Sequence, residues 1–154
     1  NRAEILRTSR AAQEIAEQVR GFLDAGYSEE DIAVIASHEQ LQRVEEGLSA
    51  HEVRCRFGES EHGTAVSLVD FMGVKGLEKE VVLVTGIEDL YDRSKARGMF
   101  EDEDVLYRRE LLSRRKVYVA LTRPLERLIV YYQDPNNRFV SELLAINRDI
   151  LSRW

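Results

Sequence analysis

Ile32-Ala33-Val34-Ile35-Ala36 is an unbroken apolar run, and it decides the class of fold. A strand with one face in water alternates apolar and polar residues, whereas a strand covered on both faces is apolar throughout. Val81-Val82-Leu83-Val84, within a strand expected over 80–85, repeats this pattern. The two runs therefore predict an α/β fold, in which helices lie on both faces of a mostly parallel sheet.

Strand and helix patterns alternate along the rest of the chain, which predicts right-handed βαβ units. Ser9 is the expected N-cap of a helix over 11–23, and Gly26 is its expected end. The charged stretch 88–104 is expected to be a loop with at most a helical turn. The other expected strands are 4–7, 53–57, 64–69 and 128–132, and the other expected helices are 38–49, 104–121 and 141–151.

In such sheets, ligand groups sit on loops at the carboxyl ends of the strands. This rule directs attention to the residues after Val69, to those after Thr85 and to the surroundings of the helix before Leu128. Two sequence motifs, described below, lie in or near these places.

The chain has 154 residues, which fits one compact domain, and its 44% apolar and 32% charged residues are a normal balance for a globular protein. The formal net charge of −6 argues against tight DNA binding by this chain alone, because phosphate neutralisation supplies most of such affinity. A local basic stripe is nevertheless present, and it consists of Arg108, Arg109, Arg114, Arg115 and Lys116.

Several classes of site are excluded by composition. Cys55 is the only cysteine, so no intramolecular disulfide or multi-cysteine metal site can form, and a buried structural thiol is expected. His38, His51 and His62 lack metal-ligand spacing, so surface positions and no metal site are expected. No apolar run approaches a membrane span and no signal peptide opens the chain, which predicts a cytoplasmic protein. The first residue is Asn1 rather than Met, which suggests a fragment of a longer chain.

Gly73-Val74-Lys75-Gly76-Leu77-Glu78 follows one expected strand and precedes another. Gly73 and Gly76 permit a close backbone approach or a positive φ, which a loop around a phosphate or ribose requires. The N–H groups of such a turn attract anions, Lys75 adds a cation, and Glu78 can accept hydrogen bonds from a sugar hydroxyl. Taken alone, however, the pattern favours an ordinary turn.

Arg114-Arg115-Lys116-Val117-Tyr118-Val119-Ala120-Leu121-Thr122-Arg123-Pro124 is first basic and then apolar, as expected for the end of a helix. Arg123 would lie before the strand 128–132, where the doubly wound geometry puts ligands. Glu110 and Glu126 are close in sequence. A structural salt bridge of Arg123 is therefore an equally good interpretation of this stretch alone.

Together, the two stretches resemble motifs V and VI of UvrD/Rep-family superfamily 1 DNA helicases, whose patterns are roughly K-G-L-E and R-R-x-x-Y-V-A-x-T-R-A. Motif V would occupy about 70–78 and motif VI about 114–124, and the resemblance extends over 4–132. It implies the second, C-terminal RecA-like motor domain of an ATP-dependent DNA helicase, an ATP hydrolase of the DNA-repair type. The short polar stretch 58–63 lies where many relatives insert an accessory domain, so no such insertion is expected.

The resemblance also implies roles for individual residues. Arg123 would be the catalytic arginine finger for ATP, which the first RecA-like domain of the parent chain would hold together with Mg²⁺. Glu78 would contact the ribose, and Lys75, Gly76 and Arg115 would belong to the nucleotide-facing site. Arg115 is further expected to orient its helix through a carboxylate. Single-stranded DNA is the expected polymer partner, and repair or transcription proteins could be further partners.

The chain departs from the family in several respects. Asp70 and Met72 stand where relatives have a threonine and a histidine that hold the nucleic-acid backbone. The repulsion between a carboxylate and a phosphate weakens the DNA-contact role that Asp70, Met72 and Gly73 would otherwise have. Pro124 replaces an alanine and is expected to end the helix. No G-x-x-x-x-G-K-[ST] loop or acidic Walker B pair is present, so the isolated chain is predicted not to hydrolyse ATP.

Two other hypotheses are compatible with these residues. The first is a degenerate RecA-like domain retained as a protein- or nucleic-acid-binding regulatory module without motor activity, which Asp70, Met72 and the acidic balance favour. The second is an unrelated doubly wound nucleotide or signalling domain. The lack of a phosphate loop and the helical arginine motif both count against it.

Overall fold

The computed structural model describes residues 2–58, 64–96, 98 and 101–147. The strands form one sheet in the order β1-β6-β5-β2-β4-β3, and every neighbouring pair is parallel. These strands are β1 (Arg2–Arg7), β2 (Ile32–Ala36), β3 (Cys55–Phe57), β4 (Val66–Val69), β5 (Lys79–Thr85) and β6 (Pro124–Tyr132). The helices are α1 (Ala11–Asp24), α2 (His38–Ala50), α3 (Ile87–Lys95), α4 (Glu103–Leu121) and α5 (Arg138–Asn147), and a 3-10 turn, η1 (Glu29–Asp31), precedes β2.

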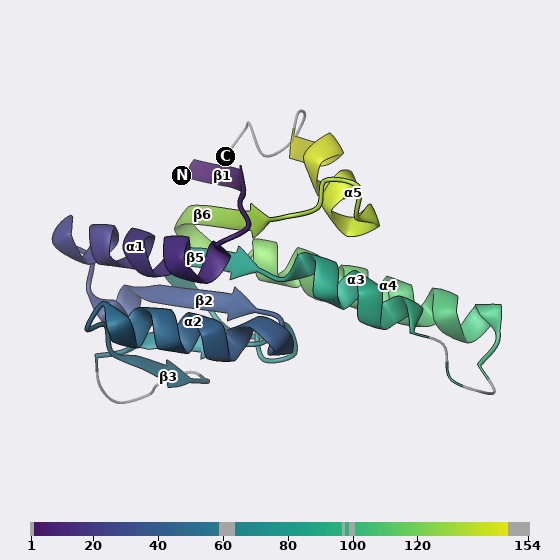
Figure 1. The fold of residues 1–154 in the computed structure, drawn as a ribbon, viewed down its shortest axis with the longest axis horizontal. Coiled ribbons are helices and arrows are strands. Elements are labelled where there is room, and N and C mark those ends of the chain that lie inside the picture. The colour runs from purple at the N-terminus through teal and green to yellow at the C-terminus, as the bar shows by residue number, and fades with distance from the viewer. Residues whose placement is uncertain (1, 59–63, 97, 99–100, 148–154) are drawn as a thin grey trace.

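Helices cover both faces of the sheet, as the two apolar runs predict. Within β2, Ala33 and Ile35 face one core while Ile32, Val34 and Ala36 face the other, and all of these side chains are fully buried. The first core includes residues of α3, α4 and α5, and the second includes residues of α1 and α2, which lie side by side (Figure 1). The predicted α/β class with a parallel sheet is therefore confirmed.

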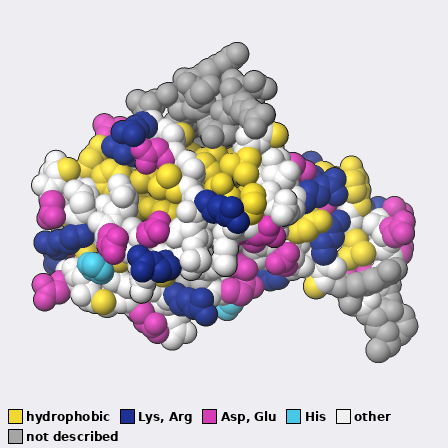
Figure 2. Space-filling view, turned by 45° about the horizontal axis from the view of Figure 1, so that its top comes forward, with side chains coloured by type: hydrophobic (Ala, Val, Ile, Leu, Met, Phe, Trp, Pro, Cys, Tyr) yellow, Lys and Arg dark blue, Asp and Glu magenta, His cyan; other side chains and the backbone are white. Residues whose placement is uncertain are grey.

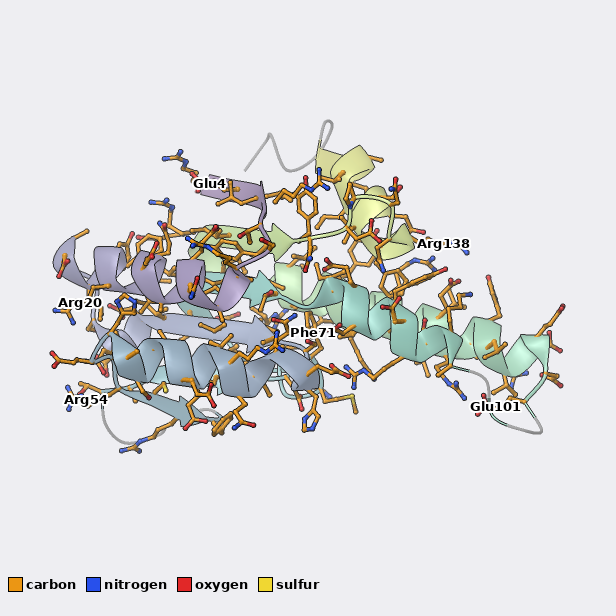
Figure 3. The ribbon with its side chains drawn as sticks, in the orientation of Figure 1. Glu4, Arg20, Arg54, Phe71, Glu101 and Arg138 are labelled. Carbon is orange, nitrogen blue, oxygen red and sulfur yellow. The ribbon has the colours of Figure 1, made fainter. Side chains whose placement is uncertain are left out.

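The helices α3 and α4 pack against each other and extend together beyond the sheet (Figure 1). Glu101 lies near the far tip of this projection, and Arg138 lies on α5 (Figure 3). At the tip, Arg109 of α4 pairs with Glu101 and also donates a hydrogen bond to the carbonyl oxygen of Ala96 at 2.5 Å. These contacts tie the connection between α3 and α4 back onto α4.

Residues 87–95 form α3 where the sequence predicts a loop, so that prediction is wrong. Ile87, Leu90 and Ser94 are buried and Tyr91 is partly buried, which is the spacing of one helix face. Charged residues fill the positions between them. The apolar face of α3 is therefore narrow, and this segment looks patternless in the sequence.

The ends of α1 agree with the prediction only in part. Arg10 rather than Ser9 is the N-cap, and no side chain caps the helix. Thr8 Oγ1 instead accepts a hydrogen bond from Arg10 N (2.9 Å) and donates one to Glu14 Oε1 (2.6 Å). The expected helix end at Gly26 is confirmed by its φ of +107°.

The last helix, α5, begins earlier than predicted. Asn137 Oδ1 accepts hydrogen bonds from the backbone N–H groups of Phe139 (3.1 Å) and Val140 (3.4 Å). An asparagine in this position satisfies N–H groups that have no partner within the helix, which explains why α5 starts at Arg138. Residues 148–151 of the predicted helix lie outside the described residues.

The cysteine and the histidines mostly lie where the sequence suggests. Cys55 is half-buried rather than buried, because β3 is an edge strand of the sheet. Burial raises the pKa of its thiol, which disfavours the reactive thiolate. His38 and His51 are exposed, as expected, and His62 lies outside the described residues.

Acidic and basic side chains are interspersed over the surface seen in Figure 2, and no continuous basic area covers that face. This distribution agrees with the formal net charge of −6. In the described ranges, no helix is both long enough and apolar enough to cross a bilayer. A nucleic-acid contact on this domain would therefore need a local group of cations.

Glu110 of α4 is a buried carboxylate that joins three helices. Its side chain is 3% exposed and lies 2.9 Å from Lys95 Nζ of α3, 3.3 Å from Arg138 Nη1 of α5 and 3.7 Å from Arg114 Nη2. Burial alone would raise the pKa of Glu110. The hydrogen bond and charge of Lys95, with the charges of Arg138 and Arg114, outweigh burial and lower that pKa from its usual value.

We expect Glu110→Gln to lower the free energy of unfolding at pH 7 by about 2 kcal/mol, since the three cations lose their common partner but stay partly hydrated. The folded-state pKa of Glu110 lies below its unfolded-state pKa of about 4.3. The carboxylate therefore stabilises the fold fully above that pH, and its contribution disappears as the pH falls through the folded-state pKa.

Urea unfolding followed by circular dichroism at several pH values measures this effect. The difference between Glu110→Gln and the unsubstituted chain should shrink as the solution is acidified. Glu17→Gln, at an exposed position of α1, is the matched control. Equal losses in the two variants would show that Glu110 contributes no more than a surface carboxylate.

Candidate nucleotide-facing site

The loop between β4 and β5 crosses one face of the sheet, from the side where the strands end to the side where they begin. These two sides are called the carboxyl edge and the amino edge of the sheet. Because β4 and β5 both run parallel to β2, the chain must return from the carboxyl end of β4 to the amino end of β5. Phe71, Val74 and Leu77 are at most 3% exposed and belong to the same core as α4. Asp70 therefore lies at the carboxyl edge of the sheet, and Glu78 lies at the amino edge.

At the carboxyl edge, Asp70 is turned back onto its own loop. Its Oδ1 accepts hydrogen bonds from Met72 N (2.8 Å) and Gly73 N (3.0 Å). Gly73 has no positive φ, so a left-handed backbone is not the reason for this glycine, and a Cβ built there would meet its nearest protein neighbour at 3.7 Å, an ordinary contact. The three residues that align with a nucleic-acid contact thus lie together, with the carboxylate already engaged.

At the amino edge, Gly76 forms the turn into β5. Its φ is +83°, a value that favours glycine, and Leu77 N donates a hydrogen bond to Val74 O (3.1 Å). Lys75, Gly76 and Glu78 are exposed, and a Cβ built at Gly76 would meet nothing within 4 Å. The backbone of this turn is therefore open to an approaching ligand.

Arg123 lies on the same amino edge. Lys79 N donates a hydrogen bond to Arg123 O (3.3 Å), and Lys79 is the register partner of Pro124. The Arg123 guanidinium donates from Nε to Val119 O (3.0 Å) and from Nη2 to Thr122 Oγ1 (2.9 Å). Within the part of the chain that the structure describes, each of its hydrogen bonds goes to a neutral oxygen.

The expectation that Arg123 lies where doubly wound folds put ligands is wrong. A residue that follows a helix and directly precedes a parallel strand lies at the amino end of that strand, and Arg123 directly precedes β6. The salt-bridge interpretation is not supported by the described residues either. Glu110 pairs with Lys95, and Glu126 accepts a hydrogen bond from the Tyr27 hydroxyl (2.8 Å). Neutral groups hold the Arg123 guanidinium, and no carboxylate of the described residues forms an ion pair with it.

Arg114, rather than Arg115, anchors α4 through a carboxylate. Arg114 Nε and Nη2 donate to the carboxylate of Glu142 on α5 at 2.9 and 3.0 Å, and the guanidinium lies 5.5 Å from the ring centre of Phe139. The hydrogen bond with Glu142 raises the pKa of Arg114. Arg115 is exposed. The predicted orienting role of Arg115 is therefore wrong, because neighbouring helical side chains point about 100° apart and only one of them faces α5.

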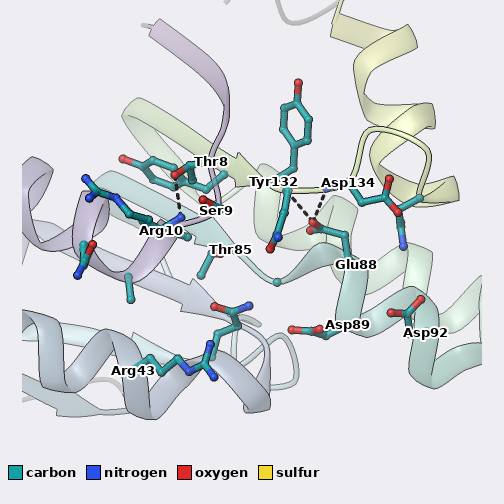
Figure 4. Close-up of a pocket in the computed structure, with 18 residues that line it drawn as sticks. Thr8, Ser9, Arg10, Arg43, Thr85, Glu88, Asp89, Asp92, Tyr132 and Asp134 are labelled. Carbon is teal, nitrogen blue, oxygen red and sulfur yellow. Dashed lines mark hydrogen bonds between the residues drawn. The ribbon is translucent and has the colours of Figure 1, made fainter.

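A crevice of about 590 Å³ lies at the opposite, carboxyl edge (Figure 4). It opens where β2 and β5 lead to helices on opposite faces, which is the usual ligand position in doubly wound sheets. Its charged wall residues are Glu88, Asp89, Asp92 and Asp134, together with Arg10 and Arg43. The excess of carboxylates disfavours a phosphate there. The amino edge with Arg123 is therefore the better candidate for contact with a nucleotide.

No protein-family model matches the chain, and no curated protein matches its sequence. Among solved structures, the chain is similar to the C-terminal domain of a possible DNA helicase from Lactobacillus plantarum WCFS1. The TM-score is 0.59 and the sequence identity is 15%, over 91% of this chain and 78% of that domain. This likeness shows the fold alone: the chain shares its α/β fold with that domain.

Proposed function

We propose that this chain is the C-terminal, second motor domain of an ATP-dependent DNA helicase or translocase of the UvrD/Rep type. The observation that carries the proposal is the arrangement at the amino edge of the sheet. There the Arg123 guanidinium, bonded only to neutral oxygens in the described ranges, shares one edge with the turn at Gly76 and Glu78. An arginine that forms no ion pair within the described residues of its own domain can bind an anionic ligand that another domain holds.

In the proposed mechanism, the first RecA-like domain of the parent chain holds most of the ATP and its Mg²⁺. Closure of the two domains brings Arg123 to the γ-phosphate, where its charge stabilises the transferred phosphoryl group. Val119 O and Thr122 Oγ1 already fix Nε and Nη2 of this arginine. The side chain is therefore oriented before the ligand arrives, and no carboxylate of the described residues has to be displaced.

The turn beside Arg123 can supply the remaining contacts to the nucleotide. Glu78 is exposed and can accept hydrogen bonds from ribose hydroxyls, and the open backbone at Gly76 permits a close approach. Lys75 is an exposed cation of the same turn and can add positive charge on this side. Arg115 is also exposed, but it lies about two helical turns before Arg123 on α4, away from this edge. Opening of the two domains after hydrolysis would then move the motor along a single DNA strand.

The test compares ATP hydrolysis by the isolated chain with that by a parent chain that also carries a phosphate-binding loop. We expect the isolated chain to show no turnover above background, with or without single-stranded DNA, because its sequence has no loop for the β- and γ-phosphates. The parent should hydrolyse ATP faster when DNA is added. A parent that binds ATP and DNA but never hydrolyses ATP would rule out the motor role.

A regulatory module without motor activity is the second candidate function. The hydrogen bonds that turn Asp70 onto its own loop favour it, because a bound nucleic acid cannot use a carboxylate as a backbone contact. Such a module would bind a protein or nucleic acid while the parent shows no ATP turnover. Full-length ATPase and unwinding assays separate the two candidates.

A further inference from the structure

A small cavity of about 200 Å³ lies between α3, α4 and the loop that follows β4. His38, the first residue of α2, and Asp70, which directly follows β4, both line it, so the cavity opens at the carboxyl edge of the sheet. This is the edge opposite to Arg123. Its cationic wall residues are Arg93 of α3 and Arg109 and Lys116 of α4.

The wall of this cavity is basic in a chain whose formal net charge is −6. Lys116 is partly buried and has no hydrogen bond or ion pair with any described residue. Arg93 Nε lies 3.2 Å from Glu39 Oε1, but the two side chains are 53% and 46% exposed, so water screens this pair. An anion in the cavity would therefore meet two cations that no buried carboxylate neutralises.

The remaining charges around the cavity are already engaged. Asp70 is the carboxylate of the wall, and its Oδ1 accepts two backbone N–H groups of its own loop. Arg109 pairs with Glu101 at the tip of the α3–α4 projection. Arg109 therefore has a structural role, and the capacity to bind an anion rests on Lys116 and Arg93.

Two further features indicate what kind of anion fits. The amino end of α2, with its partial positive charge, reaches the cavity at His38. A volume of about 200 Å³ lies below the roughly 300–1,000 Å³ of pockets that take whole small molecules, so one phosphate group fits better than a nucleotide. Met72 is 70% exposed and also lines the cavity, where a sugar or base can pack on it.

We infer that this cavity holds a backbone phosphate of single-stranded nucleic acid, with Lys116 and Arg93 as its cationic ligands. The inference rests on the proposed function and names a part of the nucleic-acid track. In this chain, the phosphate contact is supplied by side chains of α3 and α4, because Asp70 and Met72 of the adjacent loop cannot supply it. The loop then contributes the apolar surface of Met72 and no charge.

The experiment is a binding titration of the 154-residue chain with a fluorescent oligothymidylate, without ATP, at several salt concentrations. One phosphate contact to a single strand contributes about 0.7 to the slope of log K against log salt, or roughly fivefold in affinity near 0.1 M salt. Lys116→Gln and Arg93→Gln should each weaken binding by about that factor and reduce the slope by about 0.7. Arg20→Gln, which removes an exposed cation from α1, is the matched control and should change little.

A variant with the opposite effect strengthens this test. Glu39→Gln removes the partner of Arg93, so it should tighten oligothymidylate binding, whereas a purely structural role for the pair would weaken it or leave it unchanged. Lys116→Arg keeps the charge and should retain binding, and thermal unfolding of each variant verifies that it is folded. Equal effects of Lys116→Gln and Arg20→Gln would overturn the inference. Binding of inorganic phosphate at Lys116 without any oligothymidylate binding would overturn it as well.

The two proposals can fail separately. A parent chain without ATP turnover would reject the motor role, while Lys116-dependent binding of oligothymidylate by this chain would still support the phosphate site. Conversely, DNA-stimulated hydrolysis with unchanged binding in Lys116→Gln would retain the motor and reject the phosphate site.

Discussion

Replacing Arg123 by alanine in the parent motor should lower DNA-stimulated kcat for ATP by about 10³-fold, while ATP binding survives. The expected loss is large because an arginine finger acts on charge that develops only during phosphoryl transfer. Its contribution to ground-state binding is small by comparison. Steady-state hydrolysis with saturating single-stranded DNA, together with equilibrium binding of a fluorescent ATP analogue, measures the two quantities independently.

The geometry around Arg123 suggests two companion variants. Arg123→Lys keeps the charge but loses the planar group whose Nε and Nη2 bond to Val119 O and Thr122 Oγ1, so it should recover only part of the rate. Arg108→Ala removes an exposed cation from the same helix and should leave kcat within about twofold, as is usual for surface positions. Unchanged turnover in Arg123→Ala would exclude the arginine-finger role.

Gly86→Ala should lower the free energy of unfolding by about 3 kcal/mol or more, through left-handed strain and overpacking together. Gly86 follows β5 with a φ of +88°, and a Cβ there would lie 2.6 Å from Ser37 Cβ and 2.9 Å from Ser37 N. Ser37 cannot move away easily. It is fully buried, its N donates to Thr85 O (3.2 Å), and its hydroxyl donates to Asp89 Oδ2 (2.5 Å).

Two other glycines separate the causes of this loss in urea-unfolding measurements. Gly26→Ala meets the strain of a positive φ, +107°, without any atom within 4 Å of the new Cβ, so it should lose only about 1–2 kcal/mol. Gly21→Ala lies within α1, with open space and no positive φ, and should gain about 0.5–1 kcal/mol. A Gly86→Ala variant no less stable than Gly26→Ala would contradict the predicted clash with Ser37.

The central strands could be predicted from sequence because burial on both faces leaves an unbroken apolar run. Ile32 to Ala36 form β2, as predicted. The start of strand β6, in contrast, does not follow from such a run. Pro124 was expected to end a helix, and it does follow α4, but it also opens β6 four residues before the predicted start at Leu128. A proline fits the first position of a strand, where a missing N–H is tolerated.

The sequence singles out residues for a candidate site, but it does not reveal where they lie in the fold. The sequence shows that Arg123 follows a helix and precedes a strand, and this order places it at the amino end of that strand, where the carboxyl-end rule for ligands does not apply. The choice between Arg114 and Arg115 depends on where α5 packs, which no local pattern reveals. Arg93 could not be predicted, because it lies on α3, whose narrow apolar face gives no clear helical pattern in the sequence.

The strap of chain that runs under α4 from Asp70 to Glu78 has a mechanical consequence. Its middle is anchored in the core by the buried side chains of Phe71, Val74 and Leu77, so its two ends cannot move independently of each other. We expect a ligand that displaces one end of this segment to shift the other end as well, because the segment moves as one unit. By thermodynamic reciprocity, a ligand bound at either end must then change the affinity for a ligand at the other end by the same factor.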